Sequence, residues 1–257
     1  MKTLVLSLGN TSLFGGVFAD GKRQKSFRLP IRTIAVADSG KLGRLFTGCV
    51  RGKIDRVVLC SVVPALTRKV AAWLRRNGGA EPQILTVDAP HGLKIGYRQP
   101  GELGTDRLAA ALGARSLFPK RDVIVVDCGT ATTVTALHRN GTLLGGAILP
   151  GLALWPTMLA SRTAQLPEVP TAKPRAALGR STREALQSGF FHGHAGAIRE
   201  LVDRIRREAF GHAKVVVIGT GGNAERFSKE KLFDRLEPDL VLIGLNDFSL
   251  RLNAAQL

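Results

Sequence analysis

The chain contains the same pattern twice, as Val5-Leu6-Ser7-Leu8-Gly9-Asn10-Thr11 and as Val125-Val126-Asp127-Cys128-Gly129-Thr130-Ala131-Thr132-Thr133. In each copy an apolar strand enters a small polar turn, and then a second strand, a hairpin turn (20–21 or 140–141) and a third strand follow. Backbone N–H groups and hydroxyls in such a turn can bind an oxyanion. The repeat therefore predicts two turns that hold one nucleotide triphosphate from both sides. Ser7 stands where the second copy has Asp127.

The rest of the chain alternates between predicted strands and helices. The expected strands lie at 25–29, 56–60, 83–87, 122–127, 143–149, 214–218 and 239–243, and the expected helices at 34–47, 64–76, 105–116, up to 159, 181–207, from 223, and at the end of the chain. This order is typical of an α/β protein with parallel strands beside antiparallel hairpins. The duplicated opening predicts two like domains, residues 1–117 and 118–257. A Pro-rich stretch over 166–174 is a candidate loop or lid.

Composition indicates a globular protein. Of its 257 residues 44% are hydrophobic and 22% are charged, and no apolar run approaches the ~20 residues that cross a bilayer, so we expect no membrane segment. Cys49, Cys60 and Cys128 are isolated, which predicts core packing rather than a disulfide framework or a zinc site. A reducing cytoplasm fits this cysteine usage.

The chain is strongly basic, with 37 Lys and Arg against 20 Asp and Glu and a formal net charge of +17. A nucleic-acid partner is one interpretation. However, aromatic residues make up only 5% of the chain, so stacking platforms for single strands are scarce. We expect basic residues dispersed over solvated helix faces, where they steer anionic substrates, and we do not expect nucleic-acid binding as the main role.

Two acidic residues are candidates for chemistry. Asp127 ends an apolar strand, where a carboxylate is costly to bury unless it is paired; it either caps the next N–H groups or binds a hard cation. Asp106, within 104–107, lies in the first turn of a predicted helix, where the helix dipole stabilises it. It is either an ordinary capping residue or a general base that takes a proton from a hydroxyl, with Arg107 positioning an anion.

Other polar features are less specific. Hydroxyls of Thr130, Thr132 and Thr133 could contact a phosphate in the second turn. The glycine turn 219–222 could pass close to an adenine or ribose, although glycine runs alone are not specific. The histidines at 192 and 194 lack metal-ligand spacing, so we expect no metal there.

Taken together, these residues resemble the type III pantothenate kinases of bacteria, which belong to the sugar kinase, heat-shock and actin superfamily. The resemblance runs from Leu4 to about Leu245. Its motifs are Leu8-Gly9-Asn10-Thr11, Ser61-Val62-Val63-Pro64, Tyr97 to Pro100, Leu103-Gly104-Thr105-Asp106-Arg107, 126–133, Gly145-Gly146-Ala147-Ile148, Pro150-Gly151, 162–167, Ser181-Thr182, 185–189 and Thr220-Gly221-Gly222. This many motifs in order is highly specific.

The resemblance implies two tandem RNase H-like (actin-like ATPase) domains with mixed sheets flanked by helices. It also implies a homodimer that transfers the γ-phosphate of ATP to the primary hydroxyl of pantothenate, the first step of coenzyme A synthesis. Asp106 would be the general base, and Asp127 would hold potassium or ammonium, while Mg²⁺ accompanies ATP. ATP would be held by Ser7, Leu8, Gly9, Asn10, Thr11, Ser12, Leu13, Phe14 and Thr130. Pantothenate would be held by Tyr97, Gly104, Thr105, Asp106 and Arg107, with Thr182 from the partner side.

The chain departs from the family at Ser7, where the family has Asp. Losing a charged group at a catalytic position commonly costs ~10²–10³-fold in rate. We therefore expect ATP and pantothenate binding with slow turnover, unless another acid compensates. One alternative is a catalytically degenerate paralogue that acts as a regulatory or ligand-sensing protein. A nuclease of the RNase H-like fold is a third interpretation, although such enzymes need clustered acids around two metals.

Overall fold

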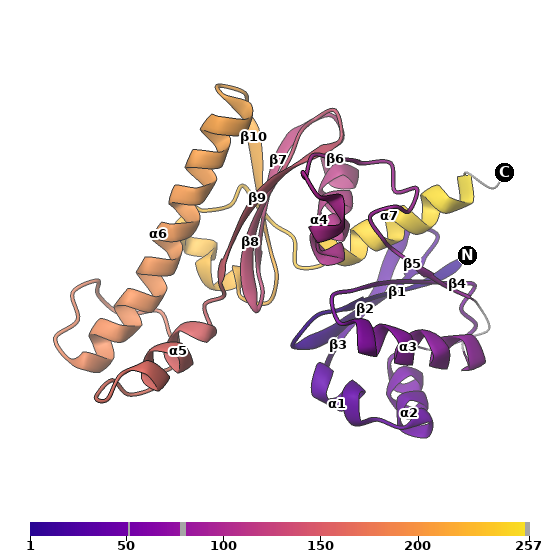
Figure 1. Ribbon diagram of the computed structural model, residues 1–257, viewed down its shortest axis with the longest axis horizontal. Helices are drawn as coiled ribbons and strands as arrows, with labels where there is room; N and C mark the ends of the chain where they lie inside the picture. The colour runs from indigo at the N-terminus through magenta and orange to yellow at the C-terminus, as the bar shows by residue number, and fades with distance from the viewer. Residues whose placement is uncertain (51, 78–80, 255–257) are drawn as a thin grey trace. The chain divides into compact units, whose positions relative to one another are not determined.

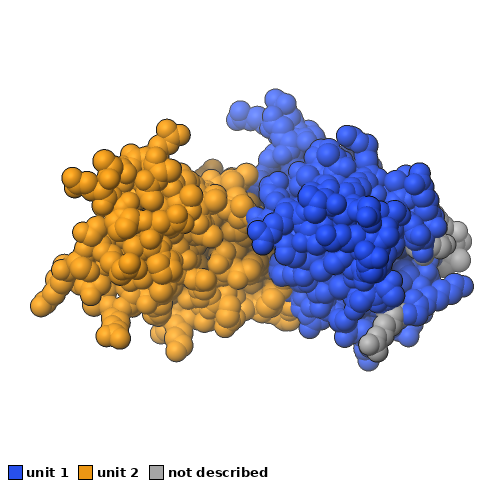
Figure 2. Space-filling view, turned by 90° about the horizontal axis from the view of Figure 1, so that it is seen from below, with its two compact units in different colours: residues 1–119, 239–257 blue, residues 120–238 orange. Residues whose placement is uncertain are grey.

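The computed structural model describes residues 1–50, 52–77 and 81–254. The chain divides into two compact units, which Figure 2 colours blue and orange: unit 1 combines 1–119 with 239–257, and unit 2 is 120–238. In each unit an antiparallel three-stranded meander continues into parallel strands. The mixed sheets flanked by helices confirm the predicted fold class.

In unit 1 the strands pair in the order β3-β2-β1-β4-β5. They are β1 (Lys2–Leu8), β2 (Ser12–Ala19), β3 (Lys22–Pro30), β4 (Arg56–Ser61) and β5 (Pro82–Ile84). The helices are α1 (Ile31–Val36), α2 (Ser39–Cys49), α3 (Pro64–Asn77), α4 (Thr105–Leu117) and α7 (Leu240–Ala254), and the short β6 (Lys94–Ile95) and η1 (Pro100–Glu102) precede α4.

The two faces of β1 meet different helices. Leu4, Leu6 and Leu8 belong to the hydrophobic cluster that α1, α2 and α3 complete. Successive side chains of a strand point to opposite faces, so Val5 and Ser7 face the other side. Helix α7 packs on that side of β1, and α4 packs beside it on the neighbouring strand β4, as Figure 1 shows. The fold therefore directs Ser7 toward the helix that begins at Thr105.

Helices α4 and α7 approach each other closely because small residues line their contact. A Cβ added at Gly113 would lie 2.2 Å from the carbonyl oxygen of Leu240, and one added at Gly244 would lie 1.8 Å from that of Ala109. This packing places α7 in unit 1, whereas the sequence-based division assigned 239–257 to the second half.

The strand predicted at 239–243 is wrong, because α7 begins at Leu240, directly after a turn at Asp239. A short, continuously apolar run fits a buried strand and a buried helix equally well. Here Leu240, Leu242 and Leu245 are all fully buried, so the run lacked the polar face that reveals an amphipathic helix.

In unit 2 the strands repeat the order of unit 1, as β9-β8-β7-β10-β11. They are β7 (Asp122–Cys128), β8 (Ala131–Leu137), β9 (Thr142–Pro150), β10 (Val215–Thr220) and β11 (Arg235–Leu236), and the helices are α5 (Leu154–Arg162), α6 (Thr182–Phe210) and the 3₁₀ helix η2 (Ala224–Glu230). Ile124 and Val126 of β7 pack with Phe191 and Ile198 of α6 in the core of this unit. The repeat in the sequence therefore corresponds to a repeated strand order in the structure.

Local polar groups explain two further differences from the sequence prediction. The helix expected over 34–47 is divided into α1 and α2, because Asp38 caps α2 by accepting a hydrogen bond from the N–H of Lys41 (2.7 Å). The α-helix expected from 223 is instead η2. Along the described ranges, no helix combines the length and apolar character that a membrane crossing requires.

The Pro-rich stretch 166–174 forms a loop that is fastened to unit 2. Val169 is buried, the carbonyl of Thr171 accepts a hydrogen bond from Arg226 (2.6 Å), and Lys173 forms an ion pair with Glu230 (2.8 Å). These contacts tie the loop to η2 at several points, so the structure gives it the character of a strap rather than that of an open lid.

Candidate active site

The first polar turn connects β1 to β2 in unit 1. The N–H of Gly9 donates to the carbonyl of Ser12 (3.0 Å), and the carbonyl of Thr11 accepts from the N–H of Ile31 (2.9 Å). Asn10 and Thr11 expose their side chains at the tip. The turn is thus closed by its own backbone and presents small polar groups outward.

The residues predicted to hold ATP from this segment differ in what they can offer. Leu8 and Leu13 are buried in the core, so only their backbone could contact a ligand. Phe14 is half-buried, and the guanidinium carbon of Arg28 lies 3.7 Å from the centre of its ring. The polar side chains available to a nucleotide here are therefore those at the tip of the turn and at Ser7.

Ser7 lies beneath the turn and is only 9% exposed. It pairs with Cys60 across the parallel strands β1 and β4, and their side chains share a hydrogen bond. Burial raises the pKa of the Cys60 thiol to about 12, and the nearby charge of Asp106 also raises it. One buried thiol therefore lies close to both Ser7 and Asp106.

Helix α4 is fixed to the end of β4 by Thr105. Its hydroxyl donates to the carbonyl of Ser61 (3.0 Å) and accepts from the N–H of the same residue (3.1 Å). Asp106 follows, half-buried, and its Oδ1 accepts from the N–H of Arg107 (2.8 Å). A Cβ at Gly104 would lie 2.6 Å from that Oδ1, so the glycine leaves the carboxylate its space.

Arg107 and Tyr97 form a second part of the same site. Arg107 is buried, its guanidinium donates a hydrogen bond to the hydroxyl of Tyr97, and its guanidinium carbon lies 5.6 Å from the Tyr97 ring centre. Unit 1 thus brings together a carboxylate, a guanidinium and a phenol, all of which the sequence analysis had selected.

The second polar turn connects β7 to β8 in unit 2. The N–H of Gly129 donates to the carbonyl of Ala131 (3.1 Å), and the carbonyl of Thr130 accepts from the N–H of Gly151 (3.0 Å). Thr130 is exposed, as a phosphate contact requires. Thr132 is fully buried, so the expectation that its hydroxyl contacts a phosphate is wrong.

Asp127 lies against the glycine turn 219–222. Gly221 has φ +86°, and a Cβ there would lie 2.2 Å from the Oδ1 of Asp127. The backbone is also joined here, because the carbonyl of Cys128 accepts from the N–H of Asn223 (3.0 Å). Only glycine permits both the left-handed backbone and this close approach. Within the described residues, no group of three or more His, Cys, Asp and Glu is arranged to hold a metal ion.

Thr182 is exposed at the first position of α6 in unit 2. Ser181 caps this helix by accepting from the N–H of Glu184 (3.3 Å), while the carboxylate of Glu184 accepts from the N–H of Arg180 (2.8 Å). The arrangement is similar to a capping box, except that Glu184 accepts from the residue before the N-cap. Thr182 and Tyr97, both predicted to hold the same substrate, belong to different units.

Comparison with known proteins identifies the family. A model of the type III pantothenate kinase family matches residues 3–204. The chain belongs to the type III pantothenate kinase family. It is 40% identical to the type III pantothenate kinase of Legionella pneumophila (strain Corby) over 248 residues, covering 94% of this chain and 96% of that one. It is 40% identical over 246 residues to type III pantothenate kinase 1 of Francisella tularensis subsp. holarctica (strain OSU18), covering 93% and 95%. The chain is therefore a member of a kinase family.

Solved structures agree on the fold. A conserved putative Baf family transcriptional activator from Campylobacter jejuni matches with a TM-score of 0.61 at 20% identity, covering 98% of this chain and 99% of that one. A putative 2-dehydro-3-deoxygalactonokinase from Sinorhizobium meliloti matches with a TM-score of 0.59 at 13% identity, covering 97% and 99%. At these identities the likeness concerns the fold alone.

Proposed function

We propose that the chain phosphorylates pantothenate with ATP, forming 4'-phosphopantothenate in the first step of coenzyme A synthesis. The observation that carries this proposal, beside family membership, is the position of Asp106. Its charge acts on Cys60, which shares a hydrogen bond with Ser7 beneath the first polar turn. A base and a phosphate-binding turn thus belong to one compact unit.

In the proposed reaction Asp106 accepts the proton of the primary hydroxyl of pantothenate. The hydroxyl oxygen forms a bond to the γ-phosphorus of ATP, while the bond from that phosphorus to the bridging oxygen breaks and ADP leaves with its electron pair. In phosphoryl transfer the protein mainly supplies positioning and charge compensation. We assign the nucleotide contacts to Ser7, to the turn that follows it, and to Thr130.

Arg107 and Tyr97 are suited to hold the carboxylate end of pantothenate. A guanidinium binds a carboxylate with charge-assisted hydrogen bonds, and Arg107 is buried with its orientation supported by Tyr97. We place Thr182 of a second copy at the same substrate. Thr182→Val is expected to raise the KM for pantothenate with a smaller effect on kcat.

We assign a monovalent cation, potassium or ammonium, to Asp127, and Mg²⁺ to the phosphates of ATP. Hard cations prefer oxygen ligands, and Mg²⁺ commonly uses one or two carboxylates together with substrate phosphates. The position of Asp127 supports this role, because a Cβ added at Gly129 would lie 3.4 Å both from the Oδ1 of Asp127 and from the carbonyl oxygen of Ala131. When bound, the cations would neutralise charge that develops on the phosphates.

A coupled ADP-release assay tests the proposed reaction. We expect release that depends on pantothenate and increases with potassium, at a rate lowered by Ser7. ATP binding without pantothenate-dependent ADP release would instead support a regulatory or ligand-sensing paralogue. Retention on DNA that weakens with salt would support nucleic-acid binding.

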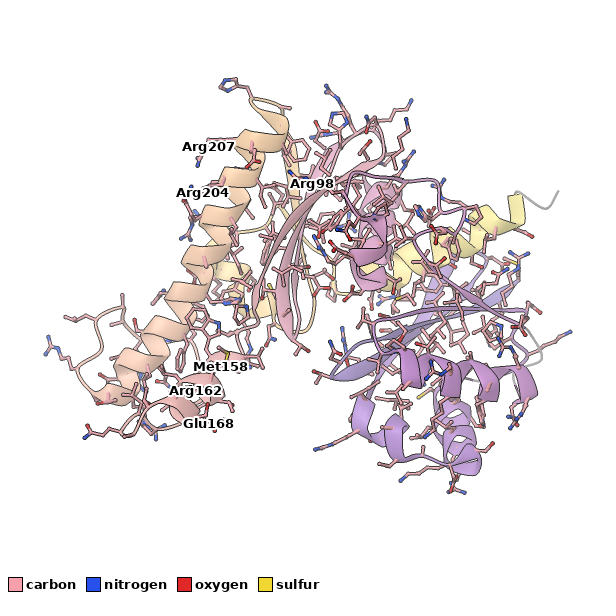
Figure 3. All side chains as sticks on the ribbon, in the orientation of Figure 1. Arg98, Met158, Arg162, Glu168, Arg204 and Arg207 are labelled. Atoms are coloured by element: carbon pink, nitrogen blue, oxygen red, sulfur yellow. The ribbon has the colours of Figure 1, made fainter. Side chains whose placement is uncertain are left out.

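We also infer a homodimer, because unit 2 exposes an apolar surface. Ile148 is 65% exposed, Leu154 38% and Met158 52%. Helices α5 and α6 line an apolar hollow of about 580 Å³ that includes Trp155 and Phe190. Figure 3 labels Met158 on α5. Of the three exposed residues Met158 also lines the hollow, and exposed apolar surface of this kind commonly marks a protein interface.

Sedimentation tests the homodimer. Met158→Arg is expected to give a monomer, because it places a charge in the apolar surface. Leu178→Arg is the matched control, since Leu178 is 76% exposed in the loop before α6 and is not among the residues that line the hollow. A wild-type protein that sediments as a monomer at all concentrations would contradict the dimer.

We place the enzyme in the cytoplasm. Cys60 and Cys128 are buried free thiols, and thiols of this kind persist in reducing compartments. Fractionation of cells that produce the tagged protein tests this placement.

A further inference from the structure

A buried polar chain lies beneath the second turn, and the reaction described above does not use it. The Nε2 atom of His194, on α6, lies 3.0 Å from the hydroxyl of Thr132 on β8. The same hydroxyl shares a hydrogen bond with the thiol of Cys128 on β7. Three elements of unit 2 therefore meet through one hydroxyl, directly below the segment 129–131.

The histidine is held in an apolar surrounding. Its ring stacks on Phe227 (centroids 5.5 Å apart, 24° between planes) and meets Trp155 edge-on (6.0 Å, 86°). Its Nδ1 is buried without a hydrogen-bond partner among the described residues. Burial lowers the pKa of His194, so the ring is neutral at pH 7.

A hydrophobic pair would fill this place more cheaply. A buried ring nitrogen without a partner is destabilising, whereas phenylalanine at 194 and valine at 132 would keep the stacking and most of the volume. Aromatic packing therefore does not account for the imidazole. The feature that only a polar group supplies is the hydrogen bond that orients the hydroxyl of Thr132.

Thr132 is well placed to transmit that orientation to the turn. It is paired with Cys128 across β7 and β8, and these two residues flank Gly129, Thr130 and Ala131 on either side. Because its hydroxyl also bonds to the thiol of Cys128, the side chain of Thr132 joins the two ends of the turn, and His194 can support this link without contacting the ligand.

We propose that His194 is a positioning residue for the phosphates of the nucleotide, acting through Thr132 on the turn 129–131. The proposal rests on the proposed ATP site at Thr130. It differs from the roles proposed above because His194 is fully buried on α6, outside the repeated motifs, and would not touch the substrates.

The test compares matched variants in the full-length enzyme. His194→Phe and Thr132→Val are each expected to raise the KM for ATP about tenfold, the effect of losing one supporting hydrogen bond. The KM for pantothenate and kcat should change less than about threefold. His194→Gln and Thr132→Ser, which keep a hydrogen-bonding group, should restore most of the affinity. His192→Phe, the same substitution on the same helix, is the control.

The double variant His194→Phe/Thr132→Val separates positioning from packing. If the two residues act through one hydrogen bond, the double variant should lose no more ATP affinity than either single variant. Additive losses, or equal increases in the KM values for ATP and pantothenate, would overturn the proposal. If His194→Phe does not fold, Thr132→Val and Thr132→Ser answer the same question.

Calorimetry with a non-hydrolysable ATP analogue separates this inference from the proposed function. If the wild type binds the analogue but does not phosphorylate pantothenate, the proposed reaction fails, while the affinities of the variants still test His194. If the wild type is an active kinase and His194→Phe binds the analogue equally well, the positioning role alone fails. A wild type that does not bind the analogue overturns both.

Discussion

The two polar turns share a strand order but obtain their charge from different places. In unit 1 the strand before the turn offers the hydroxyl of Ser7, and the carboxylate whose charge acts on Cys60, Asp106, comes from the start of α4. In unit 2 the strand itself supplies Asp127, which lies against Gly221. Duplication thus preserved the backbone while it separated the acidic groups between a helix and a strand.

Both turns also rest on a buried cysteine, and the partners of the two thiols differ. Burial raises the pKa of Cys60 and of Cys128 to about 12. The first thiol shares a hydrogen bond with Ser7, and the second with Thr132, which His194 also engages. We therefore propose base chemistry at the first turn, and cation and phosphate positioning at the second.

The largest effect is expected from the acid beside the first turn. Asp106→Asn keeps the shape of the side chain and removes its basicity, so kcat should fall about 10³-fold, within the range for loss of a general base. The KM for ATP should change little. Glu102→Gln, an exposed acid in η1, is the control. Steady-state kinetics measure both variants. Normal turnover of the Asp106→Asn enzyme would show that Asp106 is not the general base.

The carboxylate of Asp127, beside the second turn, can be displaced by a substitution at its neighbour Gly221. Gly221→Ala puts a methyl group on a carboxylate oxygen and strains the backbone, so Asp127 must move. We expect a loss of about 10²-fold in potassium-stimulated turnover, comparable to loss of one preorganised charge. Gly222→Ala, where an added Cβ meets nothing within 4 Å, should lose far less. Equal losses in the two variants, measured across a potassium titration, would break the assignment of the cation to Asp127.

The repeat and its turns could be predicted because their signals are local. Alternating strands, the glycine turns and the hairpins at 20–21 and 140–141 can be recognised in short windows. The contacts beneath the turns could not, because they depend on pairing between distant strands. Cys60 meets Ser7 only through the parallel register of β1 with β4.

Side-chain direction was the second obstacle. Thr130 and Thr132 look alike in sequence, yet one is exposed and the other is fully buried against α6. The orientation of β8 turns the side chain of Thr132 toward the core. The sequence of the threonines does not show which of their side chains will be buried. The same holds for 239–243, where packing against α4 rather than local pattern selects a helix.

A moderate effect is expected when the two turns are made alike. Ser7→Asp restores a carboxylate at the position that Asp127 occupies in the second copy, and we expect kcat to rise at least tenfold, part of the ~10²–10³-fold attributed to such a charge. The melting temperature should fall, because the new charge is buried near a thiol and close to Asp106. Ser7→Asn, which adds volume without charge, should give no gain. An ordinary wild-type rate that Ser7→Asp leaves unaltered would show that the missing acid is unimportant.

The smallest effect is expected on the loss of folding stability at low pH, which we attribute to the second turn. Burial holds the pKa of His194 below its value in the unfolded chain, near 6.5. The unfolded state therefore binds the proton more readily, and stability that is present above that pH is lost as the pH falls through it.

His194→Phe should make the decline in melting temperature on acidification shallower by about 2–4 °C. The groups beneath the first turn, Ser7 and Cys60, do not titrate in this range. Calorimetric scans from about pH 7.5 to about pH 5.5 measure the slope, with His192→Phe as the control. Parallel curves for the wild type and His194→Phe would mean that the buried imidazole does not make the second turn more acid-sensitive than the first.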